Sequence, residues 1–136
     1  MSNIEQTLSI IKPDAVERNL QDQIKNEFKN NGFEILKEKK IHISKEEAEK
    51  FYKVHESKPF YNDLCAYLSS GPIVVMSLRK DNAVLEYRKF MGATNPKEAE
   101  EGTLRKKYGI SIDKNSVHGS DSVENAKIEL DFFFKD

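Results

Sequence analysis

Two largely apolar stretches mark strands that the sequence predicts. Residues 73–78 (Ile-Val-Val-Met-Ser-Leu) form the stronger run, which is typical of a strand in the middle of a sheet covered on both faces. Residues 7–11 (Thr-Leu-Ser-Ile-Ile) predict another buried strand, and Lys12-Pro13-Asp14 ends it because proline cannot donate a hydrogen bond to a sheet. A cation, Lys12, is therefore expected at the end of the first strand.

Weaker alternation predicts two further strands. Residues 33–36 open one of them, which continues to residue 43 and points His42 to solvent. The other is expected at residues 129–134, where Leu130, Phe132 and Phe134 fall on one side of an extended chain.

Helical spacing and capping signals occupy the segments between the strands. One helix is expected from about Asp22 to Gly32, because glycine readily takes the left-handed conformation of a C-cap. Ser44 and Glu47 form a capping box before the next helix, since each side chain can bond to the backbone of the other residue. Two more helices are predicted around residues 64–68 and 83–91, and a short one at about 122–127.

The order of these elements predicts the fold class. Two strand-helix-strand units joined by helices indicate an α+β fold, an α/β sandwich of the ferredoxin-like sort with a four-stranded antiparallel sheet covered by helices. With 136 residues, we expect a single domain, 1–136, whose core needs no disulfide or structural metal. Residues 93–117 show little periodicity, and a connection of that length in a compact domain is usually functional.

Composition narrows the class of partner. Charged residues make up 33% of the chain and the net charge is -1, so there is no overall attraction to nucleic acid or to an anionic membrane. The chain begins without the basic and apolar regions of a signal peptide, and it contains no apolar run long enough to span a membrane, so we expect a cytoplasmic protein. The single cysteine, Cys65, excludes an internal disulfide.

Residues 115–122 (Asn-Ser-Val-His-Gly-Ser-Asp-Ser) place His118 among small hydrogen-bonding residues. Gly119 lets the backbone approach a bound group and take a dihedral angle that a side chain would forbid. Ser120, Asp121 and Ser122 can cap a following helix, whose N-terminus would favour anions near the imidazole. Taken alone, the stretch also describes an ordinary polar turn with an exposed histidine.

Polar residues at the predicted strand ends and in the long connection suit a polyphosphate. Lysine offers a point charge and arginine a planar fork for phosphate oxygens, and their charge stabilises a phosphoryl group during transfer. A neutral imidazole nitrogen can attack phosphorus and form a covalent phosphohistidine. On this basis the candidate set is Lys12, Arg88, Thr94, Arg105, Asn115, His118 and Ser120.

Six stretches carry a resemblance to a known family. In chain order they are residues 7–16 (TLSIIKPDAV), 59–60 (PF), 70–72 (SGP), 91–96 (MGATNP), 102–105 (GTLR) and 115–122 (NSVHGSDS). They are spread over nearly the whole chain in the family's order, and the last stretch is highly specific when it occurs together with the others. The chain resembles the nucleoside diphosphate kinases.

The resemblance implies a reversible ping-pong reaction, in which the γ-phosphate of a nucleoside triphosphate, chiefly ATP, passes through a phosphohistidine on His118 to a nucleoside diphosphate. It implies Mg2+ carried by the nucleotide phosphates rather than by the protein. The nucleotide-binding residues that it implies are Lys12, Phe60, Arg88, Thr94, Arg105 and Asn115, with Phe60 as the platform on which any base can stack.

The resemblance also implies supporting roles around the histidine. Tyr52 would support Lys12 and the transferred group, and Ser120 and Glu129 would orient His118. Without the resemblance, Tyr52 and Phe60 are more typical of aromatic residues that pack the core. Lys12, Arg88 and Glu129 are then typical of solvated surface charges.

The chain departs from the family pattern in two places. Near Arg18 the family usually has glycines where this chain has Asn19 and Asp22, although asparagine tolerates a positive φ. Lys107 stands where the family more often has an acidic residue, which could alter a salt bridge or a subunit contact.

Two other functions remain open from the sequence. One is a noncatalytic, regulatory nucleotide-binding module on the same fold, since folds do not fix functions. The other is a phosphocarrier that takes phosphate on histidine from a partner, and nucleotide affinity would separate it from a kinase. By resemblance we expect a homo-oligomer, a tetramer or hexamer built from dimers, that acts on nucleoside di- and triphosphates and needs no membrane and no nucleic acid.

Overall fold

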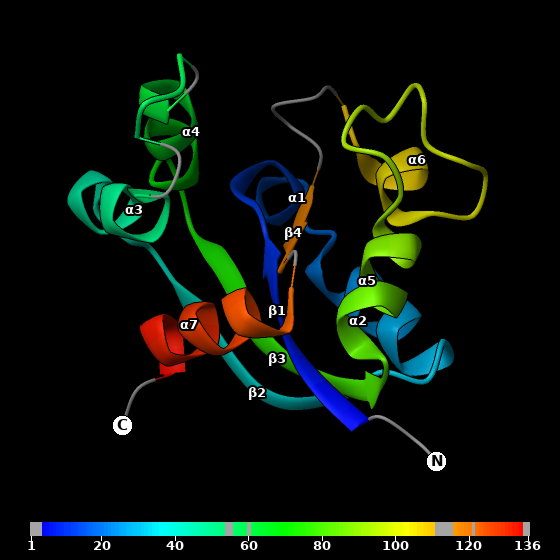
Figure 1. Ribbon diagram of the computed structural model, residues 1–136. Helices are drawn as coiled ribbons and strands as arrows, with labels where there is room; N and C mark the ends of the chain where they lie inside the picture. Colours follow the sequence, from blue (N-terminus) through cyan, green and yellow to red (C-terminus); the bar gives the residue numbers. More distant parts are fainter. Residues whose placement is uncertain (1–3, 54–55, 60, 111–115, 121, 135–136) are drawn as a thin grey trace.

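The computed structural model describes residues 4–53, 56–59, 61–110, 116–120 and 122–134. Within these residues there are four strands and seven helices, with one or two helices after each strand (Figure 1). In order they are β1 (Ile4–Ile11), α1 (Pro13–Glu17), α2 (Gln21–Asn30), β2 (Glu34–Ile41), α3 (Lys45–Phe51), α4 (Tyr61–Leu68), β3 (Ile73–Asp81), α5 (Ala83–Met91), α6 (Leu104–Tyr108), β4 (Val117–Gly119) and α7 (Val123–Phe134).

The four strands form one antiparallel sheet in the order β2-β3-β1-β4. The predicted ferredoxin-like, four-stranded antiparallel sheet is therefore confirmed. β3 occupies an interior position, as its apolar run predicts, and its residues Ile73 to Leu78 are buried. β1 pairs with β3 along its whole length, from Ile4 opposite Asp81 to Ile11 opposite Val74.

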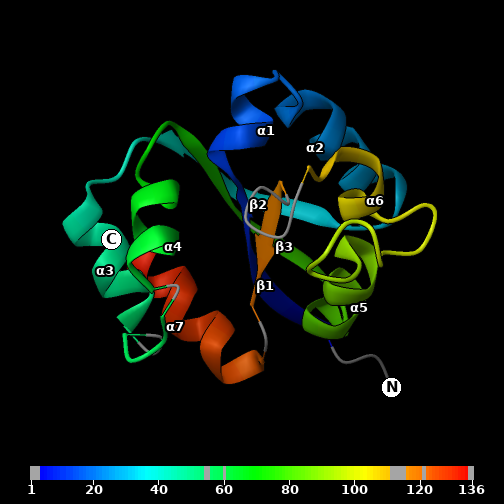
Figure 2. The same ribbon diagram turned by 90° about the horizontal axis from the view of Figure 1, so that it is seen from above.

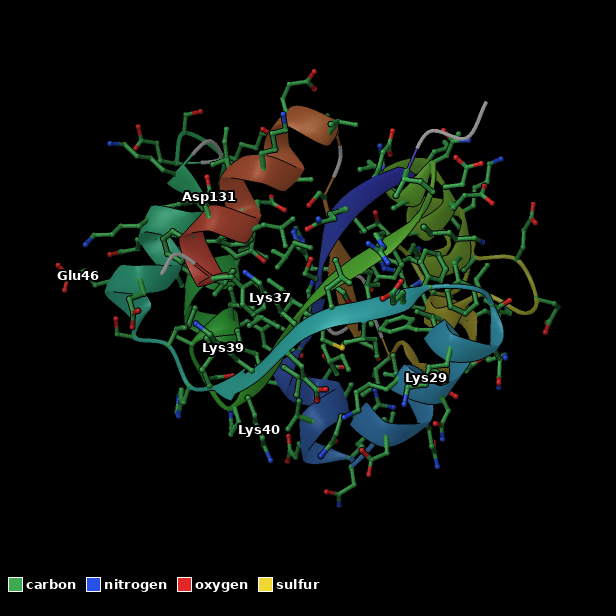
Figure 3. All side chains as sticks on the ribbon, turned by 90° about the horizontal axis from the view of Figure 1, so that it is seen from below. Lys29, Lys37, Lys39, Lys40, Glu46 and Asp131 are labelled. Carbon is green, nitrogen blue, oxygen red and sulfur yellow. The ribbon has the colours of Figure 1, made fainter. Side chains whose placement is uncertain are left out.

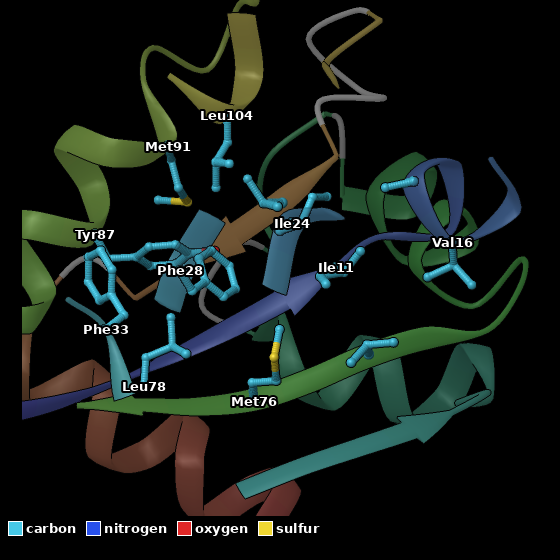
Figure 4. Packing of buried hydrophobic residues seen from close by; sticks show 13 residues of the cluster. Ile11, Val16, Ile24, Phe28, Phe33, Met76, Leu78, Tyr87, Met91 and Leu104 are labelled. Atoms are coloured by element: carbon cyan, nitrogen blue, oxygen red, sulfur yellow. The ribbon is translucent and has the colours of Figure 1, made fainter. Parts of the chain in front are cut away.

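Helices cover both faces of the sheet (Figures 1 and 2). Because successive side chains on a strand point to opposite faces, β3 contributes Val74, Met76 and Leu78 to one core and Ile73 and Val75 to the other. The first core packs against α1, α2, α5 and α6, and Figure 4 shows its side chains between these helices and the sheet. The second core packs against α3, α4 and α7.

The predicted strand at residues 129–134 is wrong, because these residues belong to the twelve-residue helix α7. Ala126, Leu130, Phe133 and Phe134 follow the i, i+4, i+7, i+8 spacing of a helix face. Ala126 is buried, and Leu130, Phe133 and Phe134 pack into the second core, while Phe132 stays 38% exposed. The fourth place in the sheet, beside β1, belongs to β4, which contains His118. Three residues give too short a pattern to identify a strand from sequence.

Several local predictions are confirmed. Ser44 and Glu47 make the reciprocal hydrogen bonds of a capping box at α3. Gly32 follows α2 with a φ of 84°, and Asn19 takes the positive φ, 60°, that asparagine tolerates. His42 is exposed, with Nε2 2.7 Å from the Ser69 carbonyl oxygen.

The long connection after α5 contains a helical turn that the sequence analysis did not predict. The Thr103 hydroxyl caps it by accepting a hydrogen bond from the Lys106 amide. At the opposite edge of the sheet, β2 is mostly exposed and carries several lysines (Figure 3). Lys39 Nζ donates to the Phe133 carbonyl at 2.7 Å, so this edge strand is tied to α7.

Candidate active site

β4 places His118 on a defined face of the sheet. His118 pairs with Ile10 of β1, and directly opposed residues of an antiparallel pair point to the same side. Ile10 belongs to the second core, so the imidazole lies on the side of α3 and α7. Its side chain is 20% exposed, which leaves part of the ring accessible.

Glu129 of α7 approaches the imidazole from one side. Its Oε1 lies 3.4 Å from His118 Nε2, and the same oxygen accepts a hydrogen bond of 2.7 Å from the Ser120 hydroxyl. Ser120 is fully buried, and its Oγ also accepts from the Leu8 amide at 3.3 Å. The structure thus brings together His118, Ser120 and Glu129, of which Glu129 was added to the candidate site by resemblance alone.

Two aromatic rings of α3 and its C-cap border the imidazole. Tyr52 lies edge-on at 6.3 Å between ring centroids, and Phe51 lies edge-on at 5.5 Å. Burial raises the pKa of the Tyr52 phenol, and the nearby Glu129 charge raises it further. Tyr52 therefore keeps its hydroxyl proton. Phe51 was missed from the sequence, since a phenylalanine at helical spacing is typical of a core residue.

Lys12 lies at the end of β1, close to β4. Its backbone is extended, with φ −75° and ψ 164°, so the alternation of β1 continues through it and puts its side chain on the same face as Ile10 and His118. Its amide donates to the Ser116 carbonyl at 2.8 Å, and Lys12 as a residue is only 6% exposed. The predicted cation is therefore largely shielded from water.

Arg105 and Arg88 come from the other side of the sheet. Arg105 on α6 donates from its two terminal nitrogens to the Gly92 carbonyl at 3.1 Å and the Val117 carbonyl at 3.0 Å, which ties α6 to the end of α5 and to β4. Burial lowers the pKa of the Arg105 guanidinium, and the nearby Arg88 charge acts in the same direction. Arg88 lies exposed in the last turn of α5.

Of the remaining predicted residues, Thr94 alone lies within the described part of the chain. Thr94 is exposed in the connection after α5, and Phe60 and Asn115 lie outside the described residues. A cavity of about 540 Å³ at this connection includes Arg88, Gly92 and Thr103 in its walls. A larger groove of about 920 Å³ between the sheet and α7 contains none of the predicted site residues.

Gly119 plays a different part from the one expected. It does not take a positive φ, because it continues the extended strand β4 opposite Ser9. A Cβ at this position would lie 2.7 Å from Met91 Cε and 2.7 Å from Tyr87 Cδ2. Glycine is needed here because α5 packs closely against β4.

The cap of α7 does follow the prediction, since the Ser122 hydroxyl accepts a hydrogen bond from the Asn125 amide at 3.1 Å.

Fold and site together define a ferredoxin-like α+β protein that presents one histidine, backed by a carboxylate, from a sheet strand. The family model described as nucleoside diphosphate kinase matches residues 5–136. This chain belongs to the nucleoside diphosphate kinase family.

Relatives and solved structures agree with this assignment. The chain is 56% identical over 132 residues to a nucleoside diphosphate kinase of Campylobacter jejuni, covering 97% of this chain and 96% of that one. It is 53% identical over 131 residues to that of Geotalea uraniireducens, covering 96% of each chain. The structure matches a crystal structure of the Aquifex aeolicus nucleoside diphosphate kinase with a TM-score of 0.95 and 36% identity, over 97% of this chain and 96% of that chain.

A second solved structure, the nucleoside diphosphate kinase of Encephalitozoon cuniculi, matches with a TM-score of 0.93 and 37% identity over 97% of this chain and 90% of that one. Across the described part of the chain, no helix is both long and apolar enough to cross a membrane.

Proposed function

We propose that this chain is a nucleoside diphosphate kinase that transfers the γ-phosphate of a nucleoside triphosphate, chiefly ATP, to a nucleoside diphosphate through a phosphohistidine on His118. The observation that carries the proposal is that Glu129 lies beside the Nε2 atom of the His118 imidazole. Because Oε1 of this carboxylate lies 3.4 Å from Nε2, it favours the tautomer with the proton on Nε2. The lone pair is then on Nδ1, which is the nucleophilic atom.

In the first half-reaction, His118 Nδ1 forms a bond to the γ-phosphorus, and the bond from that phosphorus to the bridging oxygen of the β-phosphate breaks. The nucleoside diphosphate leaves with the bond electrons. Glu129 stabilises the positive charge that develops on the imidazole, and Ser120 holds the carboxylate in place through its 2.7 Å hydrogen bond. The second half-reaction reverses these steps on a different nucleoside diphosphate.

Cationic side chains stabilise the charge on the transferring group. Lys12 is on the same sheet face as His118, and we propose that its ammonium group contacts the moving phosphoryl oxygens while Tyr52 supports it. Arg88 and Arg105, with Thr94 and Asn115, bind the remaining phosphates and the sugar. Arg105 uses its two terminal nitrogens on protein carbonyls and has further N–H groups for a ligand.

A divalent cation enters the site as part of the substrate. Within the described ranges, no three His, Cys, Asp or Glu side chains are grouped so that they could hold a metal ion. We propose that Mg2+ binds the phosphate oxygens of the nucleotide and neutralises part of their charge.

The wider context of the reaction is also proposed. Phe60 serves as a stacking platform for any base, which accounts for a broad choice of nucleotides. We propose a single catalytic domain over residues 1–136, a homo-oligomer built from dimers, and a cytoplasmic setting without membrane or nucleic-acid partners.

The test is to mix the purified protein with γ-labelled ATP and Mg2+ without an acceptor, and to look for label on the chain that is labile to acid and stable to alkali. GDP is then added. Wild type should become labelled and pass the label to GTP, whereas His118→Ala should do neither. His42→Ala is the matched control. His42 is exposed and follows β2, the edge strand farthest from β4, so this variant should behave as wild type.

Three outcomes would contradict the proposal. Label on His118→Ala would place the phosphate elsewhere. Nucleotide binding to wild type without label would indicate a regulatory binding module, and label accepted only from a phosphorylated partner protein would indicate a phosphocarrier.

A further inference from the structure

A buried carboxylate that the proposed reaction does not use lies in α1, just after the end of β1. Asp14 of α1 has a side chain only 4% exposed. Its Oδ2 accepts from Arg18 Nη2 at 3.0 Å, its Oδ1 accepts from the Tyr67 hydroxyl of α4, and its amide donates to that same hydroxyl at 3.0 Å. A buried charge is tolerated only when it is paired and hydrogen-bonded in this way.

Ser116 joins this cluster from the segment before β4. Its hydroxyl can donate to Asp14 Oδ2, at 3.1 Å, or to the Tyr108 carbonyl oxygen, at 2.9 Å. The Ser116 hydroxyl oxygen also accepts a hydrogen bond from Arg18 Nη2 at 3.0 Å. Arg18 Nη2 also donates to the Tyr108 carbonyl at 2.6 Å. Asp14, Arg18 and Ser116, which we call the junction, therefore connect α1, the end of α6 and the start of β4.

The backbone of Ser116 is unusual. It has a φ of 75° and is fully buried, and serine rarely adopts this left-handed region. A strained backbone conformation persists where the surrounding structure holds it in place. Here the hydrogen bonds of the Ser116 hydroxyl hold it. The strained peptide is also the one whose carbonyl accepts the hydrogen bond of the Lys12 amide at 2.8 Å.

The junction lies between residues of the proposed reaction. Lys12 is two residues before Asp14, and His118 is two residues after Ser116. Arg105 lies one helical turn before Tyr108 on α6. A change in the conformation of Ser116 would therefore shift the end of β1 relative to β4, and with it Lys12 relative to His118.

We infer that Asp14, Arg18 and Ser116 are positioning residues for phosphoryl transfer, which set the placement of Lys12 against His118 through the strained backbone of Ser116. This inference rests on the proposed function. None of the three needs to touch the nucleotide, because they act through the carbonyl of Ser116 on one side and the strand that follows it on the other.

Two substitutions at Ser116 separate positioning from stability. Ser116→Gly and Ser116→Ala both remove the hydroxyl, but only glycine relieves the strain of a positive φ. The measurement is the single-turnover rate of labelling His118 at saturating MgATP, together with the KM for ATP and the thermal unfolding midpoint. Both variants should label about tenfold more slowly with an almost unchanged KM, although Ser116→Gly should be the more stable of the two.

A second pair of variants tests the carboxylate. Asp14→Asn removes the charge that holds Arg18 and Ser116, and Glu17→Gln removes a carboxylate from an exposed position on the same helix. Asp14→Asn should slow labelling as the Ser116 variants do, and Glu17→Gln should label as wild type.

The outcomes distinguish this inference from the function on which it rests. Wild type that never acquires label would overturn both. Labelled wild type together with a Ser116→Gly variant that labels equally fast would overturn the inference alone, as would rates that simply follow the unfolding midpoints across the variants.

Discussion

Glu129 Oε1 lies 3.4 Å from His118 Nε2 and accepts a hydrogen bond from Ser120 Oγ at 2.7 Å, so one carboxylate oxygen connects α7 to the histidine strand. Glu129 is separated from His118 by eleven positions in the chain, and they meet because α7 packs back over β1. The contact leaves one imidazole nitrogen beside the carboxylate and the other available for reaction.

Glu129→Gln should slow labelling of His118 by about tenfold, equivalent to about 1.4 kcal/mol of activation free energy, because a neutral amide stabilises a developing imidazolium less well. Stopped-flow mixing with labelled ATP measures this rate. Glu124→Gln, at an exposed position of the same helix, is the control and should have no effect. An unchanged rate in Glu129→Gln would show that the carboxylate does not act on the histidine.

Gly119→Ala should destabilise the fold by about 1–3 kcal/mol, because the added methyl group would overlap Met91 and Tyr87 and force α5 away from β4. Urea denaturation measures the loss. Gly102→Ala is a useful comparison, since a Cβ there meets nothing within 4 Å and only its φ of 89° is unfavourable. A Gly119→Ala variant as stable as wild type would mean that α5 can move at no cost.

Glu27 and Lys107 should contribute unequally to stability. Lys107 Nζ lies 2.6 Å from Glu27 Oε1 and is 45% exposed, so Lys107→Ala should cost less than about 1 kcal/mol. Glu27 is less exposed and also accepts a hydrogen bond from the Tyr108 hydroxyl, so Glu27→Ala should cost more, about 1–2 kcal/mol. Denaturation of the two variants at low and high salt tests the order, which a larger loss in Lys107→Ala would contradict.

The free energy of unfolding should fall as the pH rises above 10. Burial and the hydrogen bond to Glu27 raise the pKa of Tyr108 to about 12, and burial raises the pKa of Tyr87. Because the pKa of these tyrosines is higher in the folded chain than the value of about 10 in the unfolded chain, the unfolded chain loses its tyrosine protons first as the pH rises. The contribution of these tyrosines to stability is therefore complete below a pH of about 10 and is lost above it. Urea denaturation between pH 9 and about 12 measures the decline, which should be shallower in Tyr108→Phe.

The apolar run of β3 and the capping box of Ser44 and Glu47 show how far local patterns reach. Both depend on residues close together in the chain, so the sequence predicts the interior strand and the start of α3 correctly. The same holds for Asn19, whose short polar side chain tolerates the positive φ that the turn before α2 requires.

The motif residues were likewise available from sequence, because the resemblance extends over nearly the whole chain. It grouped His118 with Ser120 and Glu129 before any contact between them was known. It could not place them, since the alternation of Leu130, Phe132 and Phe134 suggests a strand, while the structure has Glu129 on a helix.

Tertiary structure alone decided which segment completes the sheet. β4 is three residues long and has little pattern of its own, but its pairing with Ser9, Ile10 and Ile11 fixes the face on which the imidazole lies. The role of Gly119 and the strained conformation of Ser116 are also set by contacts with distant residues, Tyr87 and Asp14 among them. Sequence therefore determined the chemical groups and the family, whereas the packing of segments far apart in the chain determined how those groups face one another.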